Sequence, residues 1–143
     1  MSETTLIRPD KVRAYLATVY RLGHSDQDIA LTIGVRSDPL AALFTCRNID
    51  CGAFLTAYNP RGTIQPDAAN NLAHVQLTEK IQELGLESIE GSSCAEGSDW
   101  PPEKSVFALG MALEPAKALG GHFDQDAIVW VGPDAVAQLI LLR

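Results

Sequence analysis

The sequence predicts a single α+β domain whose core, at about residues 53–131, is a ferredoxin-like split β-α-β unit. Its 143 residues suit one domain with one sizeable core. With 46% hydrophobic and 20% charged residues, the composition is typical of a globular protein. From residue 53 onward, the local patterns follow the order strand, helix, strand, strand, helix, strand, which is the order of the split unit.

Two elements are predicted to precede this core. A helix is expected over residues 9–22, with Pro9 in its first turn and Gly23 after its end. Its apolar residues recur at intervals of three and four, at Val12, Tyr15, Leu16 and Val19. Residues 28–33 alternate between apolar and other residues, which predicts an added N-terminal strand.

Turn and helix signals then separate the first core strand from the first core helix. Ser37 and Asp38 before Pro39 predict a helix of one or two turns. Residues 53–58 are predicted to form a buried strand, ended by the turn at residues 59–62.

Residues 67–84 carry the clearest helical pattern, with Pro66 before them and Gly85 after them. The predicted buried stripe consists of Ala69, Leu72, Ala73, Leu77, Ile81 and Leu84.

The second half of the core is predicted from shorter patterns. Strands are expected at residues 86–90, 105–111 and 127–131, a loop at residues 91–102 and a helix at residues 114–122. In the split unit the strands at 86–90 and 127–131 are both edges of the sheet. Because the strand at 127–131 is very apolar, another element is expected to cover it. The pattern of residues 136–142 fits a strand or a helix; we favour a C-terminal strand because the turn before it is tight.

Charge is unevenly distributed along the chain. Residues 1–62 carry seven basic and six acidic side chains, and residues 63–143 carry four basic and twelve acidic ones, so the halves are +1 and −8 and sum to −7. An acidic surface repels phosphate backbones, which argues against nucleic-acid binding. The acidic half suits a basic partner or simply solubility.

Cellular location and metal content are predicted from what the chain lacks. Its longest apolar runs are far shorter than the roughly 20 residues that span a bilayer, so no membrane association is expected. The first ten residues do not resemble a secretory signal, which predicts a cytoplasmic protein. Cys46, Cys51 and Cys94 are interpreted as free thiols, and neither a metal nor a cofactor is expected.

Polar side chains gather where the strand at residues 53–58 ends. Thr56, Tyr58, Asn59 and Arg61 place hydroxyl, amide and guanidinium groups there, and strand ends are common places for ligand-binding groups. Arg61 could hold a carboxylate or a phosphate through two parallel hydrogen bonds. The alternative is that residues 59–62 form only a turn.

A second group of polar residues lies between the predicted helix at 114–122 and the strand at 127–131. His122 and Asp124 could act as an acid-base pair, with Gln125 beside them. The alternative is that His122 stabilises a helix C-terminus and Gln125 bonds to turn backbone. Trp100 and Glu103 end the predicted loop, where Trp100 could anchor a partner or hold the loop in place.

Three blocks of sequence carry a family resemblance: residues 52–60 (GAFLTAYNP), 99–103 (DWPPE) and 123–130 (FDQDAIVW). With these blocks in this order, the chain resembles the bacterial family known as domain of unknown function 3293. The resemblance implies a stand-alone, cytoplasmic bacterial domain and brings no activity, substrate or cofactor. The family-like blocks contain Thr56, Asn59, Trp100, Gln125 and Trp130. Asp124 departs from the small residue, such as glycine, that we expect at its position.

These observations favour a non-enzymatic domain that binds a small ligand or a protein. The predicted binding residues are Thr56, Tyr58, Asn59, Arg61, Trp100, Glu103, His122 and Gln125. One alternative is a small enzyme with Arg61 as the anion clamp and His122 and Asp124 as acid-base groups. The second is an interaction protein whose acidic half docks a basic partner. The sequence leaves open the ligand, the partner and the oligomeric state, and whether the protein is an enzyme.

Overall fold

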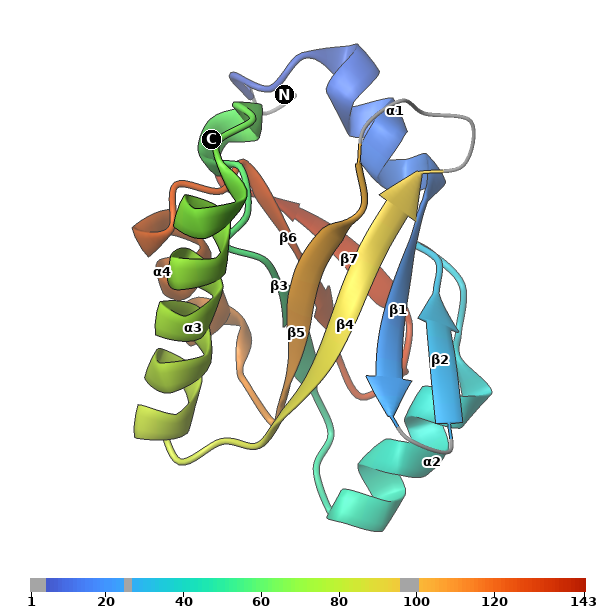
Figure 1. Cartoon of the computed structure of the whole chain (residues 1–143). Helices are drawn as coiled ribbons and strands as arrows, with labels where there is room; N and C mark the ends of the chain where they lie inside the picture. Colours follow the sequence, from blue (N-terminus) through green and yellow to red (C-terminus); the bar gives the residue numbers. More distant parts are fainter. Residues whose placement is uncertain (1–4, 25–26, 96–100) are drawn as a thin grey trace.

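The computed structural model of the chain describes residues 5–24, 27–95 and 101–143 (Figure 1). Its helices are α1 (Pro9–Ala17), α2 (Asp38–Arg47), α3 (Asp67–Glu83) and α4 (Leu113–His122), with a short 3-10 helix at Pro60–Gly62. Its strands are β1 (Thr18–His24), β2 (Gln27–Leu31), β3 (Gly52–Leu55), β4 (Ser88–Ala95), β5 (Glu103–Leu109), β6 (Ala127–Val131) and β7 (Ala137–Leu141). The predicted α+β class is confirmed. Within the described ranges, no helix is long and apolar enough to cross a bilayer.

The strands form one antiparallel sheet in the order β2-β1-β4-β5-β3-β6-β7. The sheet curls, because the chain after β2 reaches the chain beside β7. Arg36 and Val136 form a β-bridge there, and the Gly34 amide donates to the Ala137 carbonyl at 2.8 Å. The curl gives the sheet a convex and a concave face.

Each face has its own apolar core. On the convex face, α3 and α4 pack against alternate residues of the central strands, including Leu55, Val106 and Ile128 (Figure 1). The concave face holds the intervening residues, including Phe54 and Phe107, together with residues of β1, β2 and α2. Figure 1 shows α2 at one end of the curled sheet and α1 at the other.

The helix predicted after Ser37 is present as α2, which at ten residues is longer than the one or two turns expected. The Ser37 hydroxyl caps the helix by accepting the Leu40 amide at 3.2 Å. Asn48 ends it in the left-handed conformation, with φ of 57°. Leu40 and Phe44 point into the concave core.

The prediction of one helix over residues 9–22 is wrong in its second part. The helix α1 ends at Ala17, and residues from Thr18 onward form β1. Thr18, Val19 and Tyr20 are residue types that favour strands. The sheet supplies partners on both sides of β1, namely β2 and β4, and this pairing overrides the helical spacing.

The loop predicted at residues 91–102 is also partly wrong, because β4 continues to Ala95 and pairs with both β1 and β5. The strand predicted at residues 86–90 was expected to be an edge of the sheet. Because β4 pairs on both sides, it lies inside the sheet instead. Gly91 permits this pairing, since a β-carbon at that position would lie 2.3 Å from the Arg21 carbonyl oxygen.

The predicted helix at residues 67–84 is confirmed as α3, but its buried stripe is shifted. Its buried residues are Asn70, His74, Leu77 and Ile81. Leu72 and Leu84, predicted to be buried, are 61% and 56% exposed. Two of the buried positions are polar and are paired: Asn70 with Asn59, and His74 with Glu90 at 2.8 Å. An apolar pattern could not reveal them.

The remaining predictions differ from the structure mainly at their boundaries. β3 ends at Leu55 rather than at residue 58, and β2 ends at Leu31 rather than at residue 33. The C-terminal strand is confirmed as β7, which pairs along β6 and covers it as expected.

Candidate functional site

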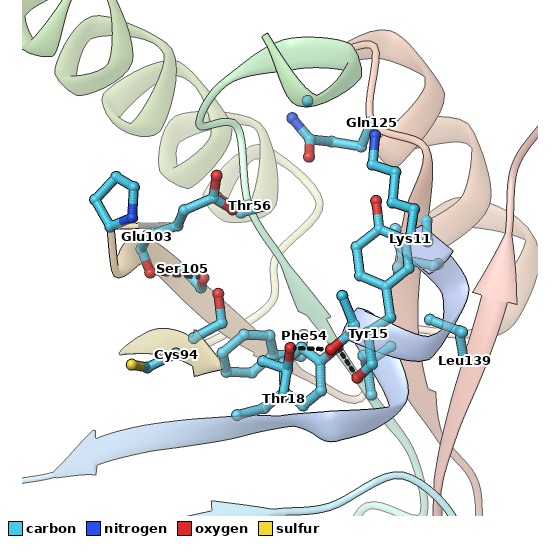
Figure 2. Close-up of a pocket in the computed structure, with 18 of the residues that line it drawn as sticks. Lys11, Tyr15, Thr18, Phe54, Thr56, Cys94, Glu103, Ser105, Gln125 and Leu139 are labelled. Carbon is cyan, nitrogen blue, oxygen red and sulfur yellow. Dashed lines mark hydrogen bonds between the residues drawn. The ribbon is translucent and has the colours of Figure 1, made fainter. Parts of the chain in front are cut away.

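A cavity of about 460 Å³ lies between α1 and the concave face of the sheet (Figure 2). We call it the α1 cavity. Its lining residues come from α1, from six of the seven strands and from the segments after β3 and before β6. The helix α1 contributes Asp10, Lys11, Ala14 and Tyr15 but buries none of its residues in the core. The helix therefore covers a space without filling it.

Aromatic and aliphatic side chains form much of the cavity wall. Tyr20 and Phe54 meet edge to face, with ring centroids 5.3 Å apart. Val129 of β6 and Leu139 of β7 continue this apolar surface. The Tyr20 hydroxyl donates to the Tyr15 carbonyl at 2.9 Å, which fixes the end of α1 above the wall.

Another part of the wall is polar, and strand register assembles it. Ser93 of β4 lies opposite Glu103 of β5, and Ser105 is two residues further along the same face of β5. Leu55 pairs with Val106, so Thr56 just beyond β3 comes beside Ser105. We call Thr56, Ser93, Glu103 and Ser105 the Glu103 patch, and all four line the cavity.

Glu103 is held in position by a buried amide network. The Asn59 side-chain amide donates to the Glu103 carboxylate at 2.9 Å. Asn59 in turn accepts from the Asn70 amide at 3.0 Å and from the Gln65 backbone at 3.1 Å. The Asn59 backbone amide donates back to Asn70 at 2.9 Å. Asn59 and Asn70 are 4% and 3% exposed, so the network orients Glu103 from a nearly water-free position.

Gln125 is positioned by the backbone around it. Its buried amide donates to the Tyr58 carbonyl at 3.1 Å and to the Phe123 carbonyl at 3.3 Å. These bonds tie the segment before β6 to the segment after β3, and the Gln125 side chain lines the α1 cavity between them. Gln125 thus bonds to backbone groups, as the alternative prediction proposed, and it also lines the cavity.

An ion cluster fastens α1 over the cavity. Asp126 has only 3% of its side chain exposed, and one of its carboxylate oxygens pairs with the Lys11 ammonium. The Arg143 Nε lies 2.8 Å from the other oxygen. A single buried carboxylate therefore joins α1, the start of β6 and the chain after β7.

Tyr15 is a cavity residue whose role the sequence did not indicate. Burial in the cavity raises the pKa of its phenol well above the usual range, and the carboxylate of Asp126 adds to this. Its hydroxyl makes no hydrogen bond with any residue that the structure describes. The phenol is therefore a neutral donor in the cavity. Tyrosines at Tyr15 and Tyr20 were visible in the sequence, but their location depends on where β1 pairs.

The structure brings together three of the predicted site residues at the cavity, Thr56, Glu103 and Gln125, with Asn59 directly behind Glu103. Trp100 falls outside the described residues. Tyr58 is half-buried, and its hydroxyl donates to the Asn71 side chain at 2.7 Å.

Arg61 and His122 lie away from this group. Arg61 and Asp124 are both largely exposed and lie 3.7 Å apart as an ion pair. Arg61 is also in the left-handed conformation, with φ of 55°, and its amide donates to the Asp124 carbonyl at 2.8 Å. His122 is exposed and contacts the ring of Phe123. The proposed acid-base pair of His122 with Asp124 is not formed, and Asp124 faces Arg61 instead.

The cysteines do not converge on one site. Cys46 and Cys94 are exposed, and the Cys51 thiol donates to the Met111 carbonyl at 3.4 Å. Burial raises the pKa of the Cys51 thiol, with a further contribution from Asp50. In the part of the chain that the structure describes, no three His, Cys, Asp or Glu side chains are grouped to hold a metal.

Comparison with known proteins identifies the family of this chain. No curated protein and no solved structure matches the chain. A family model described as "Protein of unknown function (DUF3293)" matches residues 55–128. The matched segment contains Asn59, Gln125 and the whole Glu103 patch, whereas Lys11 and Tyr15 of α1 lie outside it. On this match, the chain belongs to the family of proteins of unknown function DUF3293.

Proposed function

We propose that this protein binds a small, largely apolar molecule in the α1 cavity. The observation that carries the proposal is the cavity itself, about 460 Å³ of space inside an otherwise packed concave face. Ligand sites are typically concavities of about 300–1,000 Å³, lined mostly by apolar groups with a few oriented polar ones. The aromatic wall and the Glu103 patch supply these two features.

The packing of the rest of the molecule supports this choice. Protein interiors are close-packed, so side chains normally fill the space between a helix and the sheet face that it covers. Much of the concave face is filled, with Phe107, Val131 and Leu31 fully buried. The space beneath α1 is therefore a departure that a ligand would explain.

The other functions considered from the sequence have less support. An acid-base enzyme requires His122 and Asp124 to face a common point, but Asp124 forms an ion pair with Arg61. Docking of a basic partner on the acidic half of the chain stays a prediction.

A neutral fluorescent probe tests the proposed function directly. N-phenyl-1-naphthylamine should bind to the protein with a rise in fluorescence, because its rings enter an apolar environment. Leu139→Trp should abolish that rise, since Leu139 lines the cavity and is partly exposed, so the larger ring has room to enter the cavity.

Leu72→Trp is the matched control, because Leu72 lies on the exposed face of α3 outside the cavity. It should leave probe binding unchanged. No fluorescence rise with the wild-type protein, or equal binding by both variants, would count against a ligand site beneath α1.

We also infer that β3, α3, β4, β5, α4 and β6 form a ferredoxin-like split unit within the larger sheet. Its four strands lie in the order β4-β5-β3-β6 and pair antiparallel, and both helices lie on one face, which supports this description. A cytoplasmic location is likewise proposed, supported by the two exposed free thiols at Cys46 and Cys94.

A further inference from the structure

We propose that the α1 cavity binds the carboxamide group of an otherwise apolar ligand. The Tyr15 hydroxyl donates to the ligand carbonyl, and the Gln125 side-chain oxygen accepts from the ligand N–H. This inference rests on the ligand-binding function proposed above and specifies its ligand class. It follows from which hydrogen-bonding groups of the described cavity residues still lack a partner.

The Tyr15 hydroxyl is a donor that the cavity leaves available. Most other hydroxyls of the wall already donate to backbone carbonyls: Thr18 to Ala14 at 2.6 Å, Tyr20 to Tyr15 at 2.9 Å, Thr56 to Lys104 at 2.7 Å and Ser105 to Glu103 at 3.3 Å. The Tyr15 hydroxyl makes no such bond with any residue that the structure describes. Because burial raises the pKa of this phenol well above its usual range, it keeps its proton at neutral pH.

The Gln125 side-chain oxygen is an available acceptor in the same cavity. The amide nitrogen of Gln125 donates to the Tyr58 carbonyl at 3.1 Å and to the Phe123 carbonyl at 3.3 Å. A carbonyl only accepts, so these two bonds fix which end of the amide is nitrogen and which is oxygen. Among the residues that the structure describes, none donates to the Gln125 oxygen. Gln125 lines the cavity, and its oxygen is left for a ligand donor.

The ion cluster beneath α1 brings Tyr15 toward Gln125. Lys11 and Tyr15 are four residues apart on α1 and therefore share one face of the helix. The Lys11 ammonium pairs with Asp126, the residue that follows Gln125. Figure 2 shows the Tyr15 hydroxyl pointing from α1 toward the part of the cavity that Gln125 lines. One donor and one acceptor thus face the same space.

A carboxamide complements this pair because it carries a carbonyl acceptor and an N–H donor side by side. A ketone or an ester would bond to Tyr15 but leave the Gln125 oxygen without a donor. A carboxylate would place a charged acceptor against that oxygen. A buried polar group left without a partner costs more than a typical hydrogen bond contributes, so these groups should bind less well than an amide.

The apolar wall suits the rest of such a ligand. Tyr20 and Phe54 meet edge to face, with ring centroids 5.3 Å apart. Val129 and Leu139 extend the apolar surface on β6 and β7. A flat ring system attached to the carboxamide would be removed from water against these side chains.

Three probes that share a naphthalene body test the group preference: 2-naphthamide, 2-acetonaphthone and 2-naphthoate. They differ only in carrying NH2, CH3 or an ionised oxygen beside the same carbonyl carbon. At pH 7.5 the naphthoate is charged, because the pKa of its acid is near that of a glutamate side chain, about 4.3. In calorimetric titrations the amide should bind about fivefold more tightly than the ketone, which corresponds to one neutral hydrogen bond. Naphthoate should bind more weakly than the ketone.

Tyr15→Phe tests the donor, because it keeps the ring and removes only the hydroxyl. Since both probes use their carbonyl oxygen, the affinities of the amide and the ketone should each fall about fivefold. Tyr58→Phe is the matched control, because the Tyr58 hydroxyl bonds to Asn71 and Tyr58 does not line the cavity. It should leave both affinities unchanged.

Gln125 is tested from the ligand side, through the comparison of amide and ketone. Replacing this residue would leave the Tyr58 and Phe123 carbonyls without their donor, so a loss of binding in such a variant would not isolate the Gln125 oxygen. The exchange of NH2 for CH3 in the probe removes the same contact without changing the protein.

The outcomes separate this inference from the proposed function. If the ketone or naphthoate binds as tightly as the amide, or if Tyr15→Phe leaves the affinities of amide and ketone unchanged, the carboxamide class is wrong while a ligand site remains. The same holds if only N-phenyl-1-naphthylamine binds. If neither the three probes nor N-phenyl-1-naphthylamine binds, the ligand-binding function itself is wrong.

Discussion

The two ends of the concave face are each covered by one helix, but the helices cover them differently. The helix α2 inserts Leu40 and Phe44, and the ring of Phe44 stacks on Phe107 with centroids 6.3 Å apart. The helix α1 buries none of its residues, is fastened by Lys11 and leaves the α1 cavity beneath it. One end of the sheet is therefore built for stability and the other for access, as expected when binding regions come from the less stable parts of a fold.

Truncating one aromatic side chain at each end provides the strongest test of this contrast. Phe44→Ala should lower the free energy of unfolding by about 3–5 kcal/mol, because it removes a fully packed ring from the core. Tyr15→Ala should lower it by only about 1 kcal/mol, since its ring borders an existing cavity. Urea denaturation of both variants measures the difference. Equal losses would show that α1 is as integral to the core as α2.

The ion cluster beneath α1 gives a second, smaller test. Lys11→Met should lower the free energy of unfolding by about 1–3 kcal/mol, because the buried Asp126 keeps Arg143 but loses one partner. Lys117→Met is the matched control, since Lys117 forms an exposed i,i+3 pair with Glu114. It should cost about 0.5 kcal/mol or less. Losses of the same size in the two variants would mean that Lys11 does not hold α1 in place.

The contrast between the two ends also explains how much of the fold could be predicted from the sequence. At the α2 end the signals are local: Ser37 caps the helix, and Leu40 and Phe44 supply its apolar face. At the α1 end, Val19 continues the helical spacing of α1 although it lies in β1. The strand is stabilised by pairing with β4, more than 60 residues away in sequence, and no local pattern encodes that partner.

The residues of the candidate site also form two groups, those that could be predicted from the sequence and those that could not. Thr56, Glu103 and Gln125 were predictable because each lies near the end of a strand, and strand ends of one sheet gather. Tyr15 and Lys11 were not, because α1 reaches the cavity only after β1 has joined the sheet. Arg61 and His122 have suitable chemistry, but the turn conformation at Arg61 and the helix end at His122 leave both side chains exposed.

The loss of unfolding free energy at alkaline pH tests how enclosed the α1 cavity is. Burial raises the pKa of Tyr15 above its ordinary value of 10.0, so the phenol ionises in the unfolded chain at a pH where the folded chain keeps it neutral. The stabilisation this provides is fully present below about pH 10 and is lost as the pH rises further. Between pH 8.5 and pH 11, wild type should lose about 1.4 kcal/mol more unfolding free energy than Tyr15→Phe.

Tyr58→Phe controls for tyrosine ionisation at a more open position. The pKa of Tyr58 is also raised, by burial first and then by nearby carboxylates, but its hydroxyl lies at an exposed position beside Asn71. Its removal should therefore change the pH dependence less than removal of the Tyr15 hydroxyl, as measured by urea denaturation at several pH values. If Tyr15→Phe and wild type decline in parallel, water reaches the Tyr15 hydroxyl freely, and the α1 cavity is an open groove rather than an enclosed binding site.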